Sequence, residues 1–408
     1  MIQARYAKNR IRLKTGESQR KNGTFSYSWK DRTGKRRYVY AKTIQDLRQK
    51  EEEIARDLFD GIVHSRADLT INSYYEIWKK IKTGVRASYF ASCTRTYEYY
   101  IEPTLGKTML KNVTYSMVVM FLENLAKSRN LRYGTLRNIV LVLSMVFDLA
   151  VRDDVIRHNP CKGCLKELKR EYGKITKLVR SLTIEEQRVF ETFLSESKQF
   201  HRWSPVFTVM MWTGMRAGEV LGLRWDDVDF ENNEINVNHI FVDYSLGKGK
   251  EHVYTINPPK TRNSYRSIPM LPKVRAALLE EKENHELLGI KCISNIDGYT
   301  DFVFLNSLGK IMTGKDLNQA LNRIRDAINK EIMGGKDYHI NWFPHVHNHM
   351  LRHTFATRMR EAGADMKATS DIMGHDGILI TLKTYTDASR DFKTREITVL
   401  DDYYKNVQ

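Results

Sequence analysis

The sequence predicts a mainly α protein with small β-sheets, an α+β fold divided into three domains. Three patterns predict it. Apolar and polar residues alternate in a short basic segment at the start, apolar residues then recur at helical spacing, and the last segment mixes both patterns. The 408 residues also fit two or three domains of roughly 150 residues each. We expect the domains to span residues 1–62, 69–165 and 176–408.

The first domain is predicted to be a three-stranded sheet with one helix. Residues 25–29 read FSYSW, an alternation that places three aromatic rings on one face of a strand. A polar turn leads to a second strand that ends at residues 38–40, and residues 10–13 would supply the third strand. Residues 43–46 (TIQD) resemble a capping box, so a helix should run from there to about Phe59.

The chain carries a formal net charge of +17, which favours an anionic polymer as partner because each Lys or Arg beside a phosphate releases bound counterions. Residues 1–42 hold 13 Lys or Arg against two acidic residues, a net charge of +11. A solvated basic tail is the alternative, but a tail needs no aromatic face, so we favour a small DNA-binding sheet. The DNA-contacting residues predicted in this sheet are Arg12, Lys30, Arg32, Lys35, Arg36 and Arg37.

Helical periodicity next predicts a bundle of four helices. The predicted helices span residues 71–82, 90–101, 114–128 and 133–152. The last of them is apolar enough to be a buried core helix. Arg132 and Arg137 are left over as basic surface residues, and we expect them to contact DNA. The charged run at residues 166–174 indicates a linker.

Cys161 and Cys164 form a CxxC pair near the end of this block. With four cysteines in the chain and no second pair, we interpret them as two thiols in a linker rather than a redox or metal site. No apolar run reaches the roughly 18 residues that span a bilayer. No apolar stretch follows the basic N-terminus as it does in a signal peptide. We therefore expect a cytoplasmic protein without a membrane partner.

The third domain is predicted to begin with a helix, because residues 183–186 (TIEE) form a capping box. Strand-forming sequence follows at residues 234–243, 252–257 and 264–268, and helices continue beyond it. Within this domain the segment TGMRAGEVLGLRW places Arg216 and Glu219 three residues apart on one helix face. An arginine can bind two oxygens of a phosphate while a carboxylate fixes its orientation. A surface ion pair is the alternative.

Residues 345–357 (HVHNHMLRHTFAT) hold four histidines. His349 and His353 at i, i+4 suggest a zinc site, but the stretch lacks the Asp or Glu that would orient such ligands. The alternative pairs His349 with Arg352, which would present a proton-transfer group and a second phosphate ligand on one helix face. Further along, Gly374-His375 precedes Tyr385 by ten residues.

The order of these residues resembles the tyrosine recombinase (phage integrase) family along the whole catalytic domain. It runs from Arg216 through a lysine in a β-hairpin, His349-x-x-Arg352 and Gly374-His375 to Tyr385, within segments such as PKTRNSYRSIP and MGHDGILITLKTYT. Met373 replaces the commoner leucine before Gly-His, an apolar exchange that affects no catalytic group. The upstream layout is most similar to the integrases of conjugative transposons, in which a small sheet binds arm sites and a helical domain binds the core site.

The resemblance implies a site-specific recombinase of a mobile element, an integrase or excision enzyme that needs neither metal nor nucleotide cofactor. Tyr385 would be the nucleophile and form a 3′-phosphotyrosine, with a free 5′-hydroxyl. Arg216 and Arg352 would stabilise the transition state, and Glu219 would orient Arg216. Proton transfer and phosphate binding are assigned to Lys260, His349 and His375, with Lys248 and Lys250 as alternatives to Lys260.

The expected partners are double-stranded DNA at core and arm sites, three further copies of the chain in a homotetramer on two DNA sites, and an accessory excisionase. The enzyme would act at the nucleoid of a bacterial cytoplasm. Residues 386–408 form an apolar strip with an acidic rim, which we expect to dock on a neighbouring protomer. Three other functions are considered: a type IB topoisomerase, a non-catalytic DNA-binding regulator and a zinc hydrolase built on the histidines.

Overall fold

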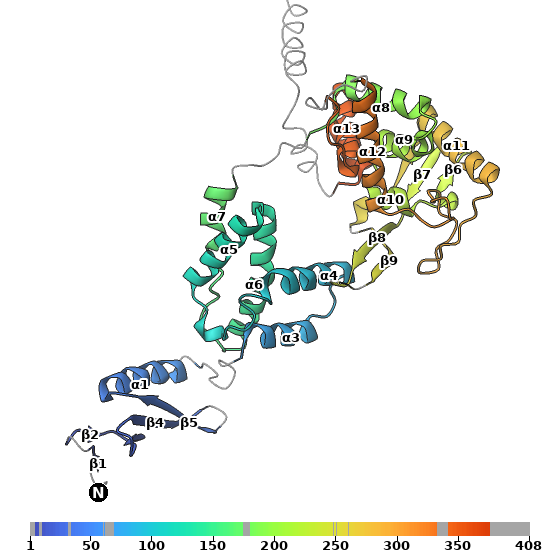
Figure 1. Cartoon of the computed structure of the whole chain (residues 1–408). Helices are drawn as coiled ribbons and strands as arrows, with labels where there is room; N and C mark the ends of the chain where they lie inside the picture. Colours follow the sequence, from blue (N-terminus) through green and yellow to red (C-terminus); the bar gives the residue numbers. More distant parts are fainter. Residues whose placement is uncertain are drawn as a thin grey trace, which may run out of the picture. The chain divides into compact units, whose positions relative to one another are not determined.

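The computed structural model divides the chain into two compact units, Met1–Thr176 with Ser245–Glu251, and Lys177–Tyr244 with His252–Gln408. It confirms a mainly α protein with small sheets (Figure 1). The first unit holds two separate hydrophobic cores, one under the N-terminal sheet and one inside a helical bundle. The described residues are 5–7, 10–31, 34–59, 61, 69–173, 180–247, 249, 251–259, 261–332 and 342–375.

The N-terminal sheet is three-stranded and antiparallel, as predicted, but its third strand is not the one expected. Strands β3 (Glu17–Gln19), β4 (Phe25–Lys30) and β5 (Arg36–Ala41) form it, and helix α1 (Ile44–Phe59) packs on it. The prediction that residues 10–13 supply the third strand is wrong. Arg12–Leu13 (β2) instead pairs with Arg5–Tyr6 (β1) in a sheet of its own.

Gly16 explains why the chain turns before β3. It has a φ of 91°, and a Cβ there would lie 2.8 Å from the carbonyl oxygen of Ser28. Only glycine allows this close approach, which brings Glu17 rather than Ile11 into register with β4.

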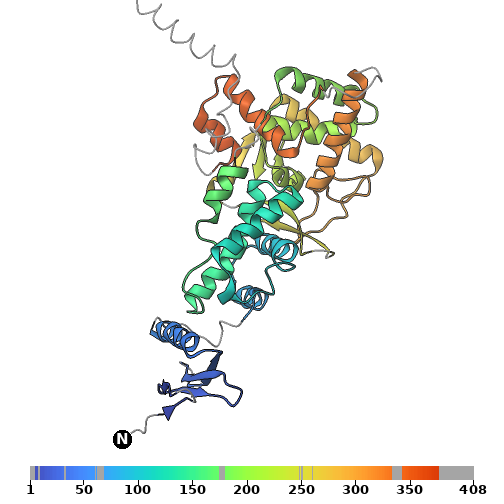
Figure 2. The same cartoon turned by 60° about the vertical axis from the view of Figure 1, so that its left-hand side comes forward.

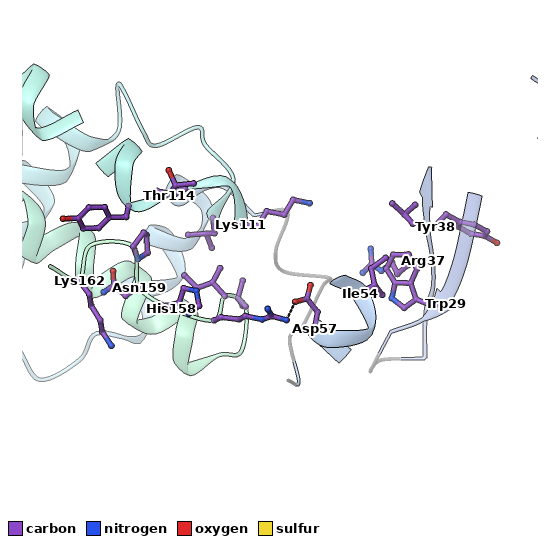
Figure 3. Close-up of a pocket in the computed structure, with 18 residues that line it drawn as sticks. Trp29, Arg37, Tyr38, Ile54, Asp57, Lys111, Thr114, His158, Asn159 and Lys162 are labelled. Atoms are coloured by element: carbon purple, nitrogen blue, oxygen red, sulfur yellow. Dashed lines mark hydrogen bonds and ion pairs between the residues drawn. The ribbon is translucent and has the colours of Figure 1, made fainter. Parts of the chain in front are cut away.

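The two faces of the sheet have different chemistry. One face turns Phe25, Val39 and Ala41 toward Leu47 of α1 and forms the small core. The other face exposes Arg36, Tyr38 and Tyr40 of β5, and exposed Lys30 lies opposite Arg36 across the β4–β5 pair. Figure 3 shows Arg37 and Tyr38 on opposite sides of the strands.

The helical bundle of the first unit confirms the four predicted helices to within a few residues. Its elements are α3 (Ile71–Ile81), α4 (Ala87–Thr96), which continues as the π-helical turn η1 (Tyr97–Ile101), η2 (Leu110–Asn112), α5 (Tyr115–Arg129), α6 (Tyr133–Arg152) and α7 (Cys164–Tyr172). By length and composition α6 could cross a membrane, but eight of its residues are buried in the bundle core. It is therefore the predicted core helix.

Helix α7 corrects two predictions. The charged run that was expected to be a linker is helical, and its Leu168 is buried in the bundle core. Cys161 and Cys164 are buried in the same core, so they are not linker thiols. Burial raises the pKa of Cys164 to about 11 and that of Cys161 further, which keeps both thiols protonated and unreactive at neutral pH.

The second unit surrounds α9 (Ser204–Thr213), whose residues are almost all buried. Helices α11 (Pro272–Leu288) and α13 (Asn348–Glu361) pack against it (Figure 1, and from another side Figure 2). Thr183 caps α8 (Ile184–Glu196) in the predicted capping box. The other helical elements are η3 (His201–Trp203), α10 (Ala217–Gly222), η4 (Trp225–Asp227), η5 (Arg262–Ser264), α12 (Gly314–Ile332) and α14 (Met366–Met373).

The strands of the second unit form a three-stranded sheet, in the order β10-β7-β6, and a β8-β9 pair. Their bounds are β6 (Val228–Asp229), β7 (Glu234–Val237), β8 (Ile240–Ser245), β9 (His252–Asn257) and β10 (Arg266–Pro269). They confirm the strand-forming sequence predicted in this domain.

Candidate active site

Two consecutive helices of the second unit position Arg216. The apolar helix α9 ends at Gly214, whose φ of 65° lets the chain turn sharply. A Cβ at Gly214 would lie 2.3 Å from the ring of Phe355, so this crossing requires glycine. Arg216 then caps the start of α10, and its side chain is 36% exposed, which leaves it accessible to a ligand.

Glu219 lies behind Arg216, as their spacing predicted. Its side chain is fully buried, and Arg216 donates to it from both Nη1 and the backbone N–H, at 2.8 Å each. Burial alone would raise the pKa of Glu219, but the hydrogen bond and charge of Arg266, and then the charge of Arg216, hold that pKa below its ordinary value. Glu219 is therefore ionised and aims the guanidinium.

Helix α13 supplies the other predicted residues. His347 caps its start by accepting a hydrogen bond from the N–H of Met350. Arg352 is buried, and it donates to the carbonyls of Gly214 at 2.6 Å and Met373 at 2.7 Å. Burial and the charge of Arg216 lower the pKa of Arg352 to about 9, so it keeps its charge at neutral pH.

Three imidazoles lie in the same positive environment. Burial, and then the charge of Arg352, lowers the pKa of His349. Burial and the neighbouring positive groups also lower the pKa of His353 and of His375 to about 4 each. All three rings are therefore neutral at pH 7, and neutral imidazole can accept a proton.

His353 packs its ring edge-on to that of His349, with centroids 4.5 Å apart. Within the described ranges, no three His, Cys, Asp or Glu side chains are grouped as ligands for a metal ion.

Sequence reasoning missed Arg266 of β10. Its side chain is 6% exposed and forms an ion pair with Glu219 at 2.8 Å. The arginine lies 47 residues from Glu219 in the chain, so no local spacing could pair them. The available signal was a charged residue in the short strand RSIP, directly after the predicted lysine loop.

Two of the predicted catalytic residues, Lys260 and Tyr385, lie outside the described residues, as do the alternatives Lys248 and Lys250 and the tail at 386–408. The strands on either side of Lys260 belong to different sheets, because β9 pairs with β8 and β10 pairs with β7. The described strands β9 and β10 therefore do not pair with each other, and the role of Lys260 stays a prediction.

The predicted DNA-contacting residues divide into three groups. Exposed side chains are those of Arg12, Lys30, Lys35, Arg36, Arg132 and Arg137. Arg37 is half-buried on the α1 side of the sheet and pairs with Asp31 at 2.9 Å. Arg32 is outside the described residues.

Comparison with known proteins identifies the family. The family model described as phage integrase family matches residues 182–391, more than half of the chain. The chain belongs to the phage integrase family. A second family model, the DNA binding domain of Tn916 integrase, matches residues 1–58, which include the N-terminal sheet and most of α1.

Two transposases are related to this integrase-family chain over almost its whole length. The transposase from transposon Tn1545 of Streptococcus pneumoniae is 29% identical over 410 residues, which cover 97% of this chain and 96% of the relative. The transposase from transposon Tn916 of Enterococcus faecalis is 28% identical over 405 residues, 95% of each chain.

Solved structures agree with the family assignment. The Tn1549 transposon integrase in complex with transposon right end DNA has a TM-score of 0.69 and 28% identity, covering 82% of this chain and all of that one. A lambda integrase dimer bound to a core site has a TM-score of 0.53 at 17% identity, covering 93% and 96%, and supports the fold alone. The chain is a tyrosine site-specific recombinase of a mobile element, as the sequence predicted.

Proposed function

We propose that this recombinase cleaves DNA through Tyr385, with Arg216 and Arg352 as the ligands of the reacting phosphate. One observation carries the assignment. Arg352 donates to the carbonyl of Met373 and Arg216 to that of the next residue, Gly374, so the two guanidinium groups converge just before His375. Two fixed cations side by side, one of them accessible, are suited to the non-bridging oxygens of one phosphate.

The chemistry requires these cations. Attack by the Tyr385 oxygen on phosphorus forms the 3′-phosphotyrosine bond and breaks the bond to the 5′-oxygen, which conserves the phosphodiester energy for religation. Negative charge grows on the non-bridging oxygens in the transition state, where preorganised donors contribute most. Arg216 and Arg352 fill the role that metal ions have in many nucleases.

Proton transfer falls to the neighbouring groups. His349 is neutral at pH 7 and accepts the proton of Tyr385, while Lys260 donates a proton to the leaving 5′-oxygen. His375, also neutral, donates a hydrogen bond from its ring N–H to the phosphate.

The remaining proposals concern DNA and assembly. The exposed face with Lys30, Arg36, Tyr38 and Tyr40 contacts arm-site DNA, and Arg132 and Arg137 contact the core site. Because four strands must be cut, we place four protomers on two DNA sites, with the tail at 386–408 docking between neighbours. An excisionase assists the reverse reaction, and the enzyme works at the nucleoid in the cytoplasm.

A nicked substrate from the ends of the mobile element tests this mechanism, because loss of the short strand traps the covalent intermediate. The wild type should form a protein–DNA adduct in EDTA, and Tyr385→Phe should form none while binding the DNA as well as the wild type. An adduct in Tyr385→Phe would contradict the assignment and direct attention to Tyr403 and Tyr404.

A divalent metal requirement at the chemical step, or tightly bound zinc in the purified protein, would also contradict the mechanism. Exchange of strands between two labelled duplexes separates recombination from relaxation by a topoisomerase.

A further inference from the structure

Three successive carbonyls at the end of α14 each accept a hydrogen bond from a different arginine. Arg266 donates from Nε to Ile372 at 2.5 Å, Arg352 to Met373 at 2.7 Å, and Arg216 to Gly374 at 2.8 Å. The last carbonyls of a helix lack partners within the helix, so these bonds complete the end of α14. Two of the three arginines have a proposed role in catalysis, and the third has none.

Arg266 also binds the carboxylate of Glu219, to which Arg216 donates as well. Its Nη2 donates to Oε2 of Glu219 at 2.8 Å and its Nη1 to Oε1 at 3.3 Å, a two-pronged contact between side chains that are 6% and 0% exposed. Nη1 also donates to the carbonyl of Ser264. Because four of the five N–H bonds of Arg266 are directed at protein oxygens, it is committed to the protein rather than to a phosphate.

Gly374 fits the same arrangement. It ends α14 at a φ of 63°, and a Cβ on it would lie 2.9 Å from Nη1 of Arg266. The glycine of the Gly374-His375 motif therefore allows the guanidinium to pass against the backbone.

The charges explain why a third arginine is needed. A buried carboxylate paired with Arg216 alone would cancel most of the charge of Arg216. With Arg266 bound to the same carboxylate, two cations share Glu219, and the formal net charge of Arg216, Arg266, Arg352 and Glu219 is +2 rather than the +1 that would remain without Arg266. We propose that Arg266 is a positioning residue of recombination, which balances Glu219 and fixes the end of α14, so that Arg216 and His375 face the phosphate correctly. This inference rests on the proposed function.

The test measures the single-turnover rate of adduct formation on the nicked substrate by the full chain. Arg266→Met should lower this rate by roughly 10- to 100-fold, the range that loss of an orienting partner costs at metal sites. Arg266→Lys keeps the charge and should recover part of the loss. The matched control is Arg275→Met, which removes a hydrogen bond to the Phe230 carbonyl in the same unit and should cleave like the wild type.

Removal of the Glu219 carboxylate distinguishes two roles of Arg266, balancing the charge of Glu219 and holding the end of α14 in place. In Arg266→Met, Glu219 is unbalanced, so adding Glu219→Gln should restore part of the cleavage rate. If the double variant is slower than Arg266→Met, the balancing role is overturned. Should Arg266→Met not fold, the neutral polar replacement Arg266→Gln, with and without Glu219→Gln, makes the same comparison.

The inference and the proposed function fail in different ways. Wild-type cleavage by Arg266→Met, alongside a wild-type adduct that Tyr385→Phe lacks, would overturn the role of Arg266 and leave the mechanism standing. A wild-type protein that forms no adduct would overturn both.

Discussion

Arg216 and Arg352 carry the same charge but differ in exposure and in hydrogen-bond partners, and we expect them to have different roles in the site. Arg352 is 2% exposed, with two carbonyl acceptors that hold it rigidly. Arg216 is far more exposed, and Glu219 and the Gly374 carbonyl take only part of its five N–H donors. We infer that Arg352 is a fixed cation of the site and that Arg216 makes the geometrically demanding contact with phosphate.

Arg216→Lys should therefore cripple cleavage although the charge is retained. An ammonium group cannot contact Glu219, the Gly374 carbonyl and two phosphate oxygens in one plane. We expect adduct formation to slow by about 100-fold or more, the cost of losing one transition-state donor, while DNA affinity measured by fluorescence anisotropy changes little. Arg325→Lys, in a surface ion pair with Asp326, is the matched control and should stay within about two-fold of the wild type. Near wild-type cleavage by Arg216→Lys would reduce Arg216 to a surface ion-pair residue.

His353 leads to a pH prediction. Its pKa in the folded chain is about 4, below the unfolded value of about 6.5, so the unfolded chain takes up a proton first as the pH falls. The free energy of unfolding should therefore decrease from about pH 6.5 toward pH 4 because of this residue. His353→Gln removes the effect. In urea unfolding followed by tryptophan fluorescence, the wild-type midpoint should fall relative to that of the variant between pH 7.5 and pH 5.

The wild type must be compared with His353→Gln because Glu51 changes the free energy of unfolding with pH in the opposite direction. Burial and the charge of Glu17 raise the pKa of Glu51 to about 7, so its contribution to folding grows as the pH falls. Glu51 is present in both proteins and cancels in the difference. A constant difference between the two midpoints over this pH range would contradict the neutral state of His353.

At the scale of elements, the pattern of apolar residues in the sequence predicted correctly the helices whose formation depends on local interactions. Four helices of the bundle have long apolar stripes, and all four were predicted with boundaries a few residues from those observed. Helix α7 was misread because its stripe is sparse within a charged run, and its helix is stabilised by the buried contacts of Cys164 and Leu168 with the rest of the bundle. The third strand was misplaced because a single glycine conformation, at Gly16, sets the turn that precedes it.

The candidate site divides in the same way. The sequence predicted that Arg216 and Glu219 would touch, because they are three residues apart on one helix. It could not predict that Arg266 joins them or that three arginines meet the end of α14, because these contacts link residues far apart in the chain, such as Arg266 with Glu219 and Arg216 with Gly374. The motif order and the family resemblance predicted which residues form the site, and tertiary packing determines the partners of those that the structure describes.

At the scale of the whole chain, the excess charge is concentrated at one end. Residues 1–42 carry a net charge of +11 out of +17, and the described sheet directs Lys30, Arg36 and two tyrosines to one exposed face. Deletion of residues 1–62 should leave an enzyme that still cleaves a core site but integrates poorly. The slope of log affinity against log salt should flatten by about 0.9 for each phosphate that the shortened protein no longer neutralises.

Replacement of single side chains on the sheet separates specific contact from bulk charge. Lys30→Gln with Arg36→Gln should flatten the salt dependence of arm-site binding by about 1.8 in slope, the effect of leaving two phosphates without a cation. Arg37→Gln also removes a positive charge, but Arg37 is turned toward α1 and paired with Asp31, so it should alter the slope less than either exposed residue. If Arg37→Gln flattens the slope as much as Arg36→Gln does, the exposed face is not the DNA-contacting face.

The deletion of residues 1–62 tests the sheet as a whole. If this deletion leaves arm-site affinity and its salt dependence unchanged, the N-terminal sheet does not bind DNA, and the excess charge must serve the core site.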